Sequence, residues 1–211
     1  MLIGICGKKQ VGKSTVGTIL ALINCFKQVE SSGFPHETIY NYIEKNFDDE
    51  YILSESQFNL KSFSERLKKI AGILCNNEYT QYEDVQFKNE VDPLTNISNR
   101  QVLQYIGEAM RNLFGEDIWI KALFRDYFGD TITGHQYWII TDVGYKNEAD
   151  YIKNKGGILI KINRNTGYND NHISEIDLDD YDKFDYIVDN NGTINQLIDK
   201  MVDIYNNLSK K

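Results

Sequence analysis

Residues 2–15 read Leu2-Ile3-Gly4-Ile5-Cys6-Gly7-Lys8-Lys9-Gln10-Val11-Gly12-Lys13-Ser14-Thr15, an apolar run followed directly by the pattern G-x-x-x-x-G-K-[ST]. In this pattern the glycines let successive backbone N–H groups curl around phosphate oxygens at the start of a helix. A strand before the loop and a helix after it are the context that the motif requires. The stretch therefore predicts a strand, a phosphate-binding loop and an α/β fold.

The polar residues of the loop have distinct expected roles. Lys13 would reach the β- and γ-phosphates of a nucleotide as a mobile point charge, and the Ser14 hydroxyl would ligate the accompanying Mg²⁺. Thr15 adds a second hydroxyl, while the glycines supply backbone freedom. The alternative interpretation is a lysine-rich surface turn, which the preceding strand disfavours. The expected nucleotide-binding residues of the loop are Gly7, Val11, Gly12, Lys13, Ser14 and Thr15.

Size and composition suit one intracellular domain. The chain has 211 residues, 41% hydrophobic, with a formal net charge of −8, so we expect a single domain over residues 1–211. No apolar stretch approaches the roughly 18 residues of a membrane helix, and a soluble, cytoplasmic protein is expected.

The acidic charge disfavours nucleic acid as a partner but still permits a local phosphate pocket. Cys6, Cys25 and Cys75 form no C-x-x-C pair, which indicates neither disulfides nor zinc.

Strand-like and helix-like segments alternate along the chain. This alternation predicts a parallel, doubly wound sheet of about five strands, flanked by helices, with ligands at the carboxyl edge of the strands. Two capping boxes, Ser62 with Glu65 and Ser98 with Gln101, mark helix starts. Strands are expected over residues 2–6, 58–63, 137–141, 158–162 and 184–188. Helices are expected over 14–23, 37–46, 64–74, 98–114, 118–127, 147–155 and 193–208.

Residues 76–96 are polar and irregular, with few apolar anchors, and predict a flexible or lid-like segment. The helix after this segment has two faces at helical spacing. The polar face is either solvated or binds a ligand, and its central glycine leaves room for a close approach. Its two arginines would lie about 16 Å apart along the axis. The polar face carries Arg100, Gln104, Gly107 and Arg111. The apolar face carries Val102, Ile106, Ala109 and Leu113.

Asp142 follows the apolar strand at 137–141, so it lies at the same sheet edge as the phosphate loop. It suits a carboxylate that holds Mg²⁺ or its water shell, and the alternative is a turn cap. Asn147 and Glu148 fit helix capping at least as well as catalysis. The acidic run 177–180 lacks calcium-loop spacing and is expected to be a solvated turn. The histidines show no spacing for a metal or catalytic pair and are expected to be structural: His36, His135 and His172.

Taken together, these motifs resemble the viral deoxynucleoside monophosphate kinases of tailed phages and similar DNA viruses. The Leu103-Gln104 and Thr141-Asp142-Val143 blocks are the most specific part of the resemblance. The matching segments are Gly7 to Thr15, Phe63 to Lys68, Arg100 to Trp119, Thr141-Asp142-Val143 with Asn147-Glu148-Ala149, Gly156-Gly157 with Arg164, His172-x-Ser174-Glu175, and Asn190-Asn191-Gly192-Thr193.

The resemblance implies a P-loop kinase fold and transfer of the ATP γ-phosphoryl group to a deoxynucleoside 5′-monophosphate, with ATP and Mg²⁺ as cofactors. Such activity supports dNTP supply for viral DNA synthesis. The dNMP is then the small-molecule partner, and a homodimer is one expected assembly. By similarity, the acceptor or the moving phosphoryl group would be held by Lys68, Arg100, Gln104, Arg111 and Trp119. Residues expected near the adenine are Arg164, Asn191, Gly192 and Thr193.

One position departs from the family pattern. Members usually read Asp-Val-Arg-Phe after the strand, whereas this chain has Gly144 and Tyr145 after Asp142-Val143. Lys146 is the expected partial substitute, although a point charge does not reproduce a bidentate guanidinium. On the motif alone, Gly144→Arg is predicted to raise affinity for the acceptor.

Catalysis by this scheme needs no strong base, because the acceptor is already an anionic phosphate oxygen. Alignment and charge neutralisation would lower the barrier, and closure of residues 76–96 would exclude water. The catalytic residues are then Lys13, Arg100, Arg111 and Asp142, and the metal-binding residues are Ser14 and Asp142. The alternatives are another small-molecule P-loop kinase, similar to dephospho-coenzyme A kinases, and a catalytically weakened nucleotide-binding interaction protein.

Overall fold

The computed structural model describes residues 1–33, 38–125, 127, 137–167 and 172–208. The chain forms two compact units: the first contains Met1–Lys61 and Gly129–Lys211, and the second contains Ser62–Phe128. The expected single domain thus takes the form of two compact units, the second inserted in the sequence of the first.

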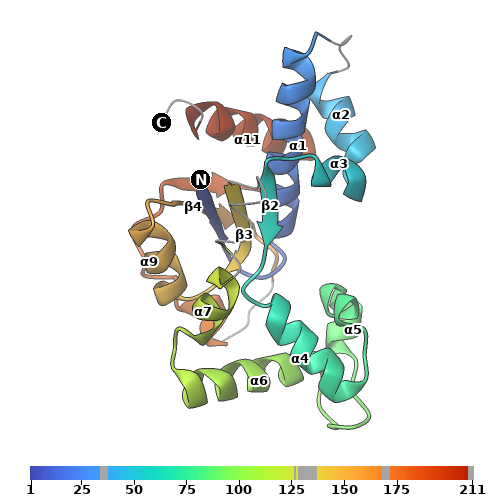
Figure 1. The fold of residues 1–211 in the computed structure, drawn as a ribbon, viewed down its shortest axis with the longest axis vertical. Coiled ribbons are helices and arrows are strands. Elements are labelled where there is room, and N and C mark those ends of the chain that lie inside the picture. Colours follow the sequence, from blue (N-terminus) through green and yellow to red (C-terminus); the bar gives the residue numbers. More distant parts are fainter. Residues whose placement is uncertain (34–37, 126, 128–136, 168–171, 209–211) are drawn as a thin grey trace. The chain divides into compact units, whose positions relative to one another are not determined.

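The first unit is built on a five-stranded parallel sheet with the order β2-β3-β1-β4-β5 (Figure 1). From β1 the chain goes to β2 and β3 on one side and then to β4 on the other, so the strand order reverses at β1. Open parallel sheets bind ligands at the carboxyl ends of strands where the order reverses. The predicted parallel, doubly wound sheet is confirmed. The strands are β1 (Leu2–Cys6), β2 (Phe58–Lys61), β3 (Tyr137–Val143), β4 (Ile158–Asn163) and β5 (Tyr186–Asp189).

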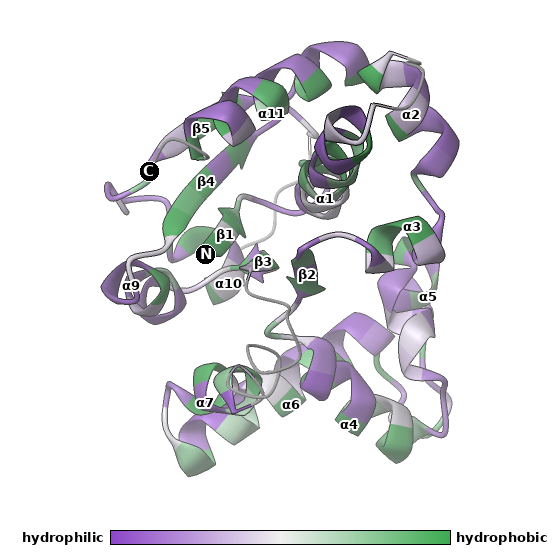
Figure 2. Cartoon of the chain, turned by 45° about the horizontal axis from the view of Figure 1, so that its top comes forward, coloured by the Kyte–Doolittle hydropathy of each residue, from purple (hydrophilic) through white to green (hydrophobic). Residues whose placement is uncertain are grey.

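Three longer helices flank this sheet: α1 (Lys13–Ser31), α9 (Lys146–Asn154) and α11 (Ile194–Leu208). Ile3 and Ile5 of β1 belong to the hydrophobic cluster that includes residues of α1 and α11. Gly4, between them, faces α9, where an added Cβ would lie 2.7 Å from Ile152 Cδ1. Helices therefore cover both faces of the sheet (Figure 1), and β4 is accordingly hydrophobic along most of its length (Figure 2).

Shorter helices in the described part of the first unit are α2 (Ile39–Asn46), α3 (Glu50–Ser54) and α10 (Ile173–Ile176). The start of α2 is capped by Thr38, whose Oγ1 accepts a hydrogen bond from Asn41 N–H at 3.3 Å. The helix predicted over residues 37–46 is thereby confirmed from Ile39 onward. Across the described parts of the chain, no helix is long and apolar enough to cross a membrane.

Among its described residues, the second unit contains α4 (Glu65–Cys75), the 3₁₀ helix η1 (Tyr79–Glu83), α5 (Val85–Asn89), α6 (Asn99–Phe114) and α7 (Ile118–Phe124). Its core contains Ala71, Tyr82 and Val102. Tyr82 is fully buried, and its ring meets that of Phe87 edge to face with centroids 5.3 Å apart. The prediction that residues 76–96 are irregular with few apolar anchors is therefore wrong, because two aromatic residues anchor the segment. A lid function for it stays a prediction.

One of the two predicted capping boxes is present. Ser98 Oγ accepts from Gln101 N–H at 3.2 Å, and Gln101 Oε1 accepts from Ser98 N–H at 3.1 Å, which confirms the start of α6. The predicted box at Ser62 is wrong, because α4 begins only at Glu65. Ser62 Oγ instead accepts from Ser64 N–H at 3.2 Å, in a tight turn after β2.

The predicted apolar face of α6 packs only over its first half. Val102 is 3% exposed, whereas Ala109 is exposed and Leu113 is 72% exposed. In the second half it is Arg111 that is buried, at 6% exposure. The prediction of a continuous apolar face is therefore wrong for Ala109 and Leu113, and the polar face is not simply solvated.

Candidate nucleotide-binding site

The phosphate loop adopts a backbone that its glycines make possible. Gly7 has φ +142° and Gly12 has φ +97°, both in the region that favours glycine. A Cβ on Gly7 would lie 2.5 Å from the Ile162 carbonyl oxygen, so this position also excludes a side chain by contact. The loop follows β1 and leads into α1 at Lys13, which confirms the predicted strand-loop-helix context.

Lys13 folds back across the loop. Its Nζ donates to the carbonyl oxygens of Gly7 at 2.6 Å and Lys8 at 2.9 Å. Burial lowers the pKa of Lys13 from its usual value, and the nearby carboxylates of Glu175 and Asp142 oppose that shift. The ammonium is thus held at the loop by two carbonyls and two negative charges.

The two side chains expected to bind the metal lie at the ends of secondary-structure elements. Ser14 is exposed in the first turn of α1. Asp142 is the second-to-last residue of β3 and acts electrostatically on Lys13, which places it at the loop. Asp142 belongs to the strand, so the alternative of a residue capping a turn is wrong.

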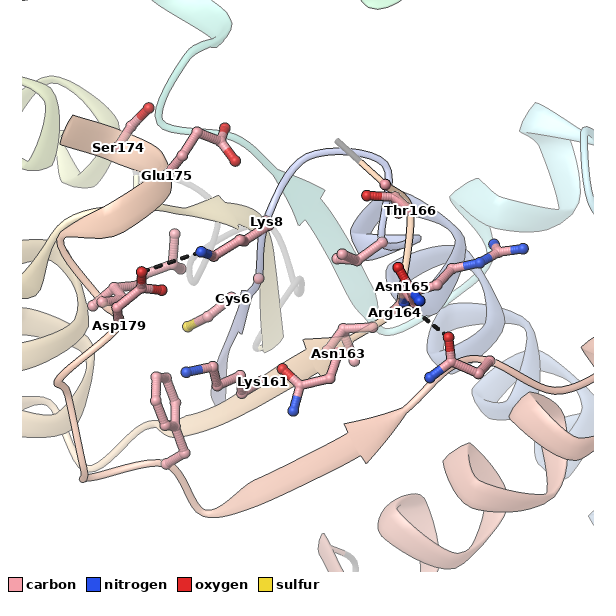
Figure 3. A pocket seen from close by; sticks show the side chains of 18 residues that line it. Cys6, Lys8, Lys161, Asn163, Arg164, Asn165, Thr166, Ser174, Glu175 and Asp179 are labelled. Carbon is pink, nitrogen blue, oxygen red and sulfur yellow. Dashed lines mark hydrogen bonds and ion pairs between the residues drawn. The ribbon is translucent and has the colours of Figure 1, made fainter. Parts of the chain in front are cut away.

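The segment around α10 contacts the loop through carboxylates. Glu175 Oε2 accepts from the loop amide Lys9 N–H at 2.7 Å, and Asp179 pairs with Lys8 Nζ at 3.1 Å (Figure 3). Both Lys8 and Asp179 are about half exposed, so their ion pair is a weak contact. The bond from Glu175 engages a backbone donor of the phosphate loop itself. A carboxylate therefore occupies one anion-binding position of this loop.

Other carboxylates of the acidic run hold the start of α9. Asp177 Oδ2 accepts from Lys146 N–H at 2.7 Å, and Asp180 pairs with Lys146 Nζ at 2.8 Å. The prediction of a merely solvated turn over residues 177–180 is therefore wrong, because these carboxylates have specific partners. Lys146, expected to bind substrate, has its ammonium directed at Asp180.

Gly144 and Glu148 also shape this region. Glu148 is 2% exposed, and its Oε2 accepts from the N–H groups of Gly144 at 3.0 Å and Tyr145 at 3.2 Å. This favours the capping role for Glu148 over a catalytic one. A Cβ on Gly144 would lie 3.0 Å from the Ser174 carbonyl oxygen, so α10 packs directly against the position where the family pattern has arginine.

A cavity of about 490 Å³ adjoins the loop within the first unit. Its lining includes Gly7 and Val11 of the loop together with Arg164 and Asn191 (Figure 3 labels Arg164). Asn191 Oδ1 accepts from Asn165 N–H at 2.8 Å and so joins the segments that follow β4 and β5. The structure thus brings two of the four residues expected near adenine to one cavity beside the loop.

The other two residues expected near adenine form the start of α11. Thr193 Oγ1 accepts from Gln196 N–H at 3.3 Å, and Gln196 Oε1 accepts from Thr193 N–H at 2.9 Å. Gly192 lies against the Gln196 side chain. Neither Gly192 nor Thr193 is among the described residues that line the cavity. Their contact with a nucleotide stays a prediction.

Apart from Lys146, the residues expected to bind the acceptor lie in the second unit. Lys68 of α4 is 7% exposed, and its Nζ pairs with Glu83 Oε1 at 2.6 Å. Glu83 is largely exposed, so this buried cation reaches the surface beside a carboxylate. Lysine side chains are seldom this buried, which makes Lys68 a candidate functional residue.

The polar face of α6 is partly buried. Arg111 Nη1 donates to the Glu116 carbonyl oxygen at 2.7 Å, and Arg100 Nη2 donates to Asn89 Oδ1 at 3.4 Å. Trp119 is buried and its Nε1 donates to the Gly107 carbonyl oxygen at 3.3 Å. Gln104 is half-buried on the same helix. The predicted grouping on one helix is present, while binding of an acceptor there stays a prediction.

The described histidine and the cysteines have structural surroundings. His172 Nδ1 accepts from Ser174 N–H at 3.3 Å at the start of α10, a structural role as predicted. His36 and His135 lie outside the described residues. Among the residues that the structure describes, no three His, Cys, Asp or Glu side chains form a metal-binding group. Cys6, Cys25 and Cys75 are free thiols, as expected.

Comparison with known proteins decides the family. A family model described as deoxynucleotide monophosphate kinase matches residues 30–201. The chain belongs to this kinase family. A protein of Acanthamoeba polyphaga mimivirus named as a deoxynucleotide monophosphate kinase is 29% identical over 172 residues, which is 76% of this chain and 89% of that protein. The deoxynucleotide monophosphate kinase of Escherichia phage RB69 is 27% identical over 106 residues, 49% of this chain and 43% of that protein.

Among solved structures, shikimate kinase from Aquifex aeolicus is similar at 12% identity with a TM-score of 0.40, covering 99% of this chain and 98% of that chain. The sequence comparisons confirm the resemblance to viral deoxynucleoside monophosphate kinases and the expectation of an enzyme of this kind. The kinase family match begins at residue 30, after the phosphate loop, so the loop and the match are separate observations.

Sequence reasoning assigned no role to Glu175. The signal was present in the His172-x-Ser174-Glu175 motif, but nothing in the spacing indicated that its carboxylate bonds to the loop. Such a contact joins residues 166 positions apart in this kinase, so only the fold reveals it.

Proposed function

We propose that this protein transfers the γ-phosphoryl group of ATP to a deoxynucleoside 5′-monophosphate, giving ADP and a deoxynucleoside diphosphate. The observation that carries the proposal is a phosphate loop with positive φ at Gly7 and Gly12, in a chain whose residues 30–201 match the deoxynucleotide monophosphate kinase family. The loop supplies phosphate binding in general, and the family supplies the class of acceptor.

The residues present fit a Mg²⁺-bound nucleotide. The loop backbone has positive φ at Gly7 and Gly12, the conformation that lets successive N–H groups curl around phosphate, and Lys13 adds a cation there. The exposed Ser14 hydroxyl and the Asp142 carboxylate are oxygen ligands of the kind that Mg²⁺ prefers, directly or through water. Bound Mg²⁺ would neutralise the charge of the donor phosphates.

The chain itself contributes alignment and charge. We assign Lys13 and the loop amides to the donor phosphates, and Arg164 with Asn191 to the part of the nucleotide that lies in the adjoining cavity. Arg100 and Arg111 on α6 are assigned to the acceptor and to the charge of the transition state. The acceptor oxygen is already anionic, so positioning of the two phosphates replaces general-base catalysis.

A second candidate is a kinase of another small acceptor, such as dephospho-coenzyme A, because the loop alone does not select the acceptor. A third is a nucleotide-binding protein with weakened catalysis, which Gly144 and the Lys146–Asp180 ion pair favour. An assembly into homodimers stays a prediction for any of the three.

One assay separates these candidates. ADP release is measured with ATP and Mg²⁺ against all common NMPs and dNMPs and against dephospho-coenzyme A, with and without EDTA. We expect EDTA-sensitive turnover with at least one dNMP. Turnover of dephospho-coenzyme A alone would support the second candidate, and tight ATP binding without any turnover would support the third.

A further inference from the structure

Asn190 is the residue directly after β5, and its side chain reaches the phosphate loop. Its Nδ2 donates to the Val11 carbonyl oxygen at 2.8 Å, although the two residues are 179 positions apart. The residue is 7% exposed. Its own backbone N–H donates to the Asn163 carbonyl oxygen at 2.7 Å, which fixes Asn190 to the end of β4. The side chain therefore links the ends of β4 and β5 to the loop.

The hydrogen bond acts on one peptide group of the loop. The carbonyl of Val11 and the N–H of Gly12 belong to the same planar trans peptide, so they point in opposite directions. A carbonyl held toward Asn190 turns the Gly12 N–H away from Asn190. Gly12 also packs against the same amide, since a Cβ there would lie 2.8 Å from Asn190 Nδ2. Asn190 thus fixes both the rotation and the depth of this peptide.

We infer that Asn190 is a positioning residue for nucleotide phosphates, which aims the Gly12 N–H at the phosphate through the Val11 carbonyl. This inference rests on the proposed function. It differs from the role near adenine expected for the neighbouring residues Asn191, Gly192 and Thr193, because the contact of Asn190 is with the phosphate loop. Removal of its amide frees the peptide to rotate and weakens phosphate binding without touching the ligand.

The test compares Asn190→Ala with the wild type in calorimetric binding of two probes, ADP and inorganic pyrophosphate, each with Mg²⁺. We expect both affinities to fall about tenfold, the size of one buried hydrogen bond. The KM for ATP should rise by a similar factor, while the KM for the dNMP stays unchanged. Asn190→Ser serves as a second variant without the amide, and thermal unfolding shows that each variant is folded at the assay temperature.

Asn46→Ala is the matched control. Asn46 in α2 is 8% exposed and its Nδ2 donates to the Tyr42 carbonyl oxygen at 2.7 Å, so it makes the same kind of bond away from the loop. Its loss should lower stability and leave both affinities unchanged. A fall for ADP alone would overturn the inference in favour of a base contact, and unchanged affinities in both Asn190 variants would overturn it outright. A wild type that binds neither probe would instead refute the proposed function.

Discussion

Two lysines of the phosphate loop allow a matched test of the donor site. Lys13 points into the loop, where Nζ donates to the carbonyls of Gly7 and Lys8. Lys8 is in the same loop, but its ammonium points outward to Asp179. Lys13→Ala and Lys8→Ala therefore remove the same charge from the same loop, and only the first removes it from the position that we propose to bind phosphate.

The structure sets different magnitudes for the two changes. Preorganised charge of the kind supplied by Lys13 stabilises a transition state by about 3 kcal/mol or more, so Lys13→Ala should lower kcat/KM at least about 100-fold. The Lys8–Asp179 pair is about half exposed on both sides, and such pairs contribute at most about 1 kcal/mol. Lys8→Ala should therefore cost less than about fivefold.

Steady-state ADP release with the best dNMP, over a range of ATP concentrations, measures both effects. Thermal unfolding of the two variants checks that the fold is retained. Equal losses in the two variants would refute the assignment of Lys13 to the donor phosphates, because the outward lysine would then matter as much as the inward one. Equal rates for Lys13→Ala and wild type would remove Lys13 from the mechanism.

The pH dependence gives a second arm of the same test. Lys13 acts as a cation, so kcat/KM for ATP should be lost as pH rises through its pKa, which burial holds below the usual lysine value. Among the nearby charges, Glu175 raises the pKa of Lys13 the most. Glu175→Gln should therefore move the alkaline limb to lower pH, and a limb that stays in place or moves to higher pH would contradict the electrostatic account.

Three further outcomes are expected elsewhere in the chain. Arg100→Ala and Arg111→Ala should both lower kcat/KM, but only Arg111→Ala should also lower the free energy of unfolding in urea, by about 1–3 kcal/mol, because its buried guanidinium is hydrogen-bonded. Wild-type kcat/KM in both variants would show that the polar face of α6 does not bind the acceptor. Gly144→Arg should lower kcat/KM in the same assay, opposite to the expectation from the motif, because its Cβ would lie too close to the Ser174 carbonyl oxygen. A higher kcat/KM would show that α10 can move to accommodate the arginine. Tyr82→Ala should destabilise the second unit by about 3–5 kcal/mol and open its segment to limited proteolysis, with Tyr82→Phe as control; unchanged resistance to protease would contradict the anchoring.

The sheet could be predicted from the sequence because its signals are local. Each strand is a short apolar run beside a turn or a helix start, and the phosphate loop fixes the direction of the first strand relative to the ligand edge. The ordered packing of residues 76–96 could not be predicted from the sequence, because its aromatic anchors, Tyr82 and Phe87, are few and separated by polar residues. Their partners lie on helices before and after the segment, and a pattern within the segment cannot show them.

The site could be predicted only where a residue acts by its place in a motif. Lys13 and Ser14 were found because the loop motif fixes their position. Glu175 and Asn190 were not assigned to the loop, because their contacts span 166 and 179 positions and depend on where α10 and β5 end. The motif alone indicates that Gly144 lacks the arginine of the family pattern, whereas the structure shows that the Ser174 backbone lies beside this position.

The acidic net charge of the chain does not describe the electrostatics at the phosphate loop. A net charge of −8 would by itself oppose binding of an anionic nucleotide. Two carboxylates near the loop, however, favour its cation: Glu175 and Asp142 raise the pKa of Lys13 against the lowering effect of burial, and Glu175 also accepts a hydrogen bond from the Lys9 amide. Local negative charge therefore favours the protonated form of the lysine that we propose to bind phosphate. Neutralising Glu175 would therefore reduce the overall negative charge and at the same time lower the pKa of Lys13 further, so the net charge of the chain does not predict the charge state of the loop.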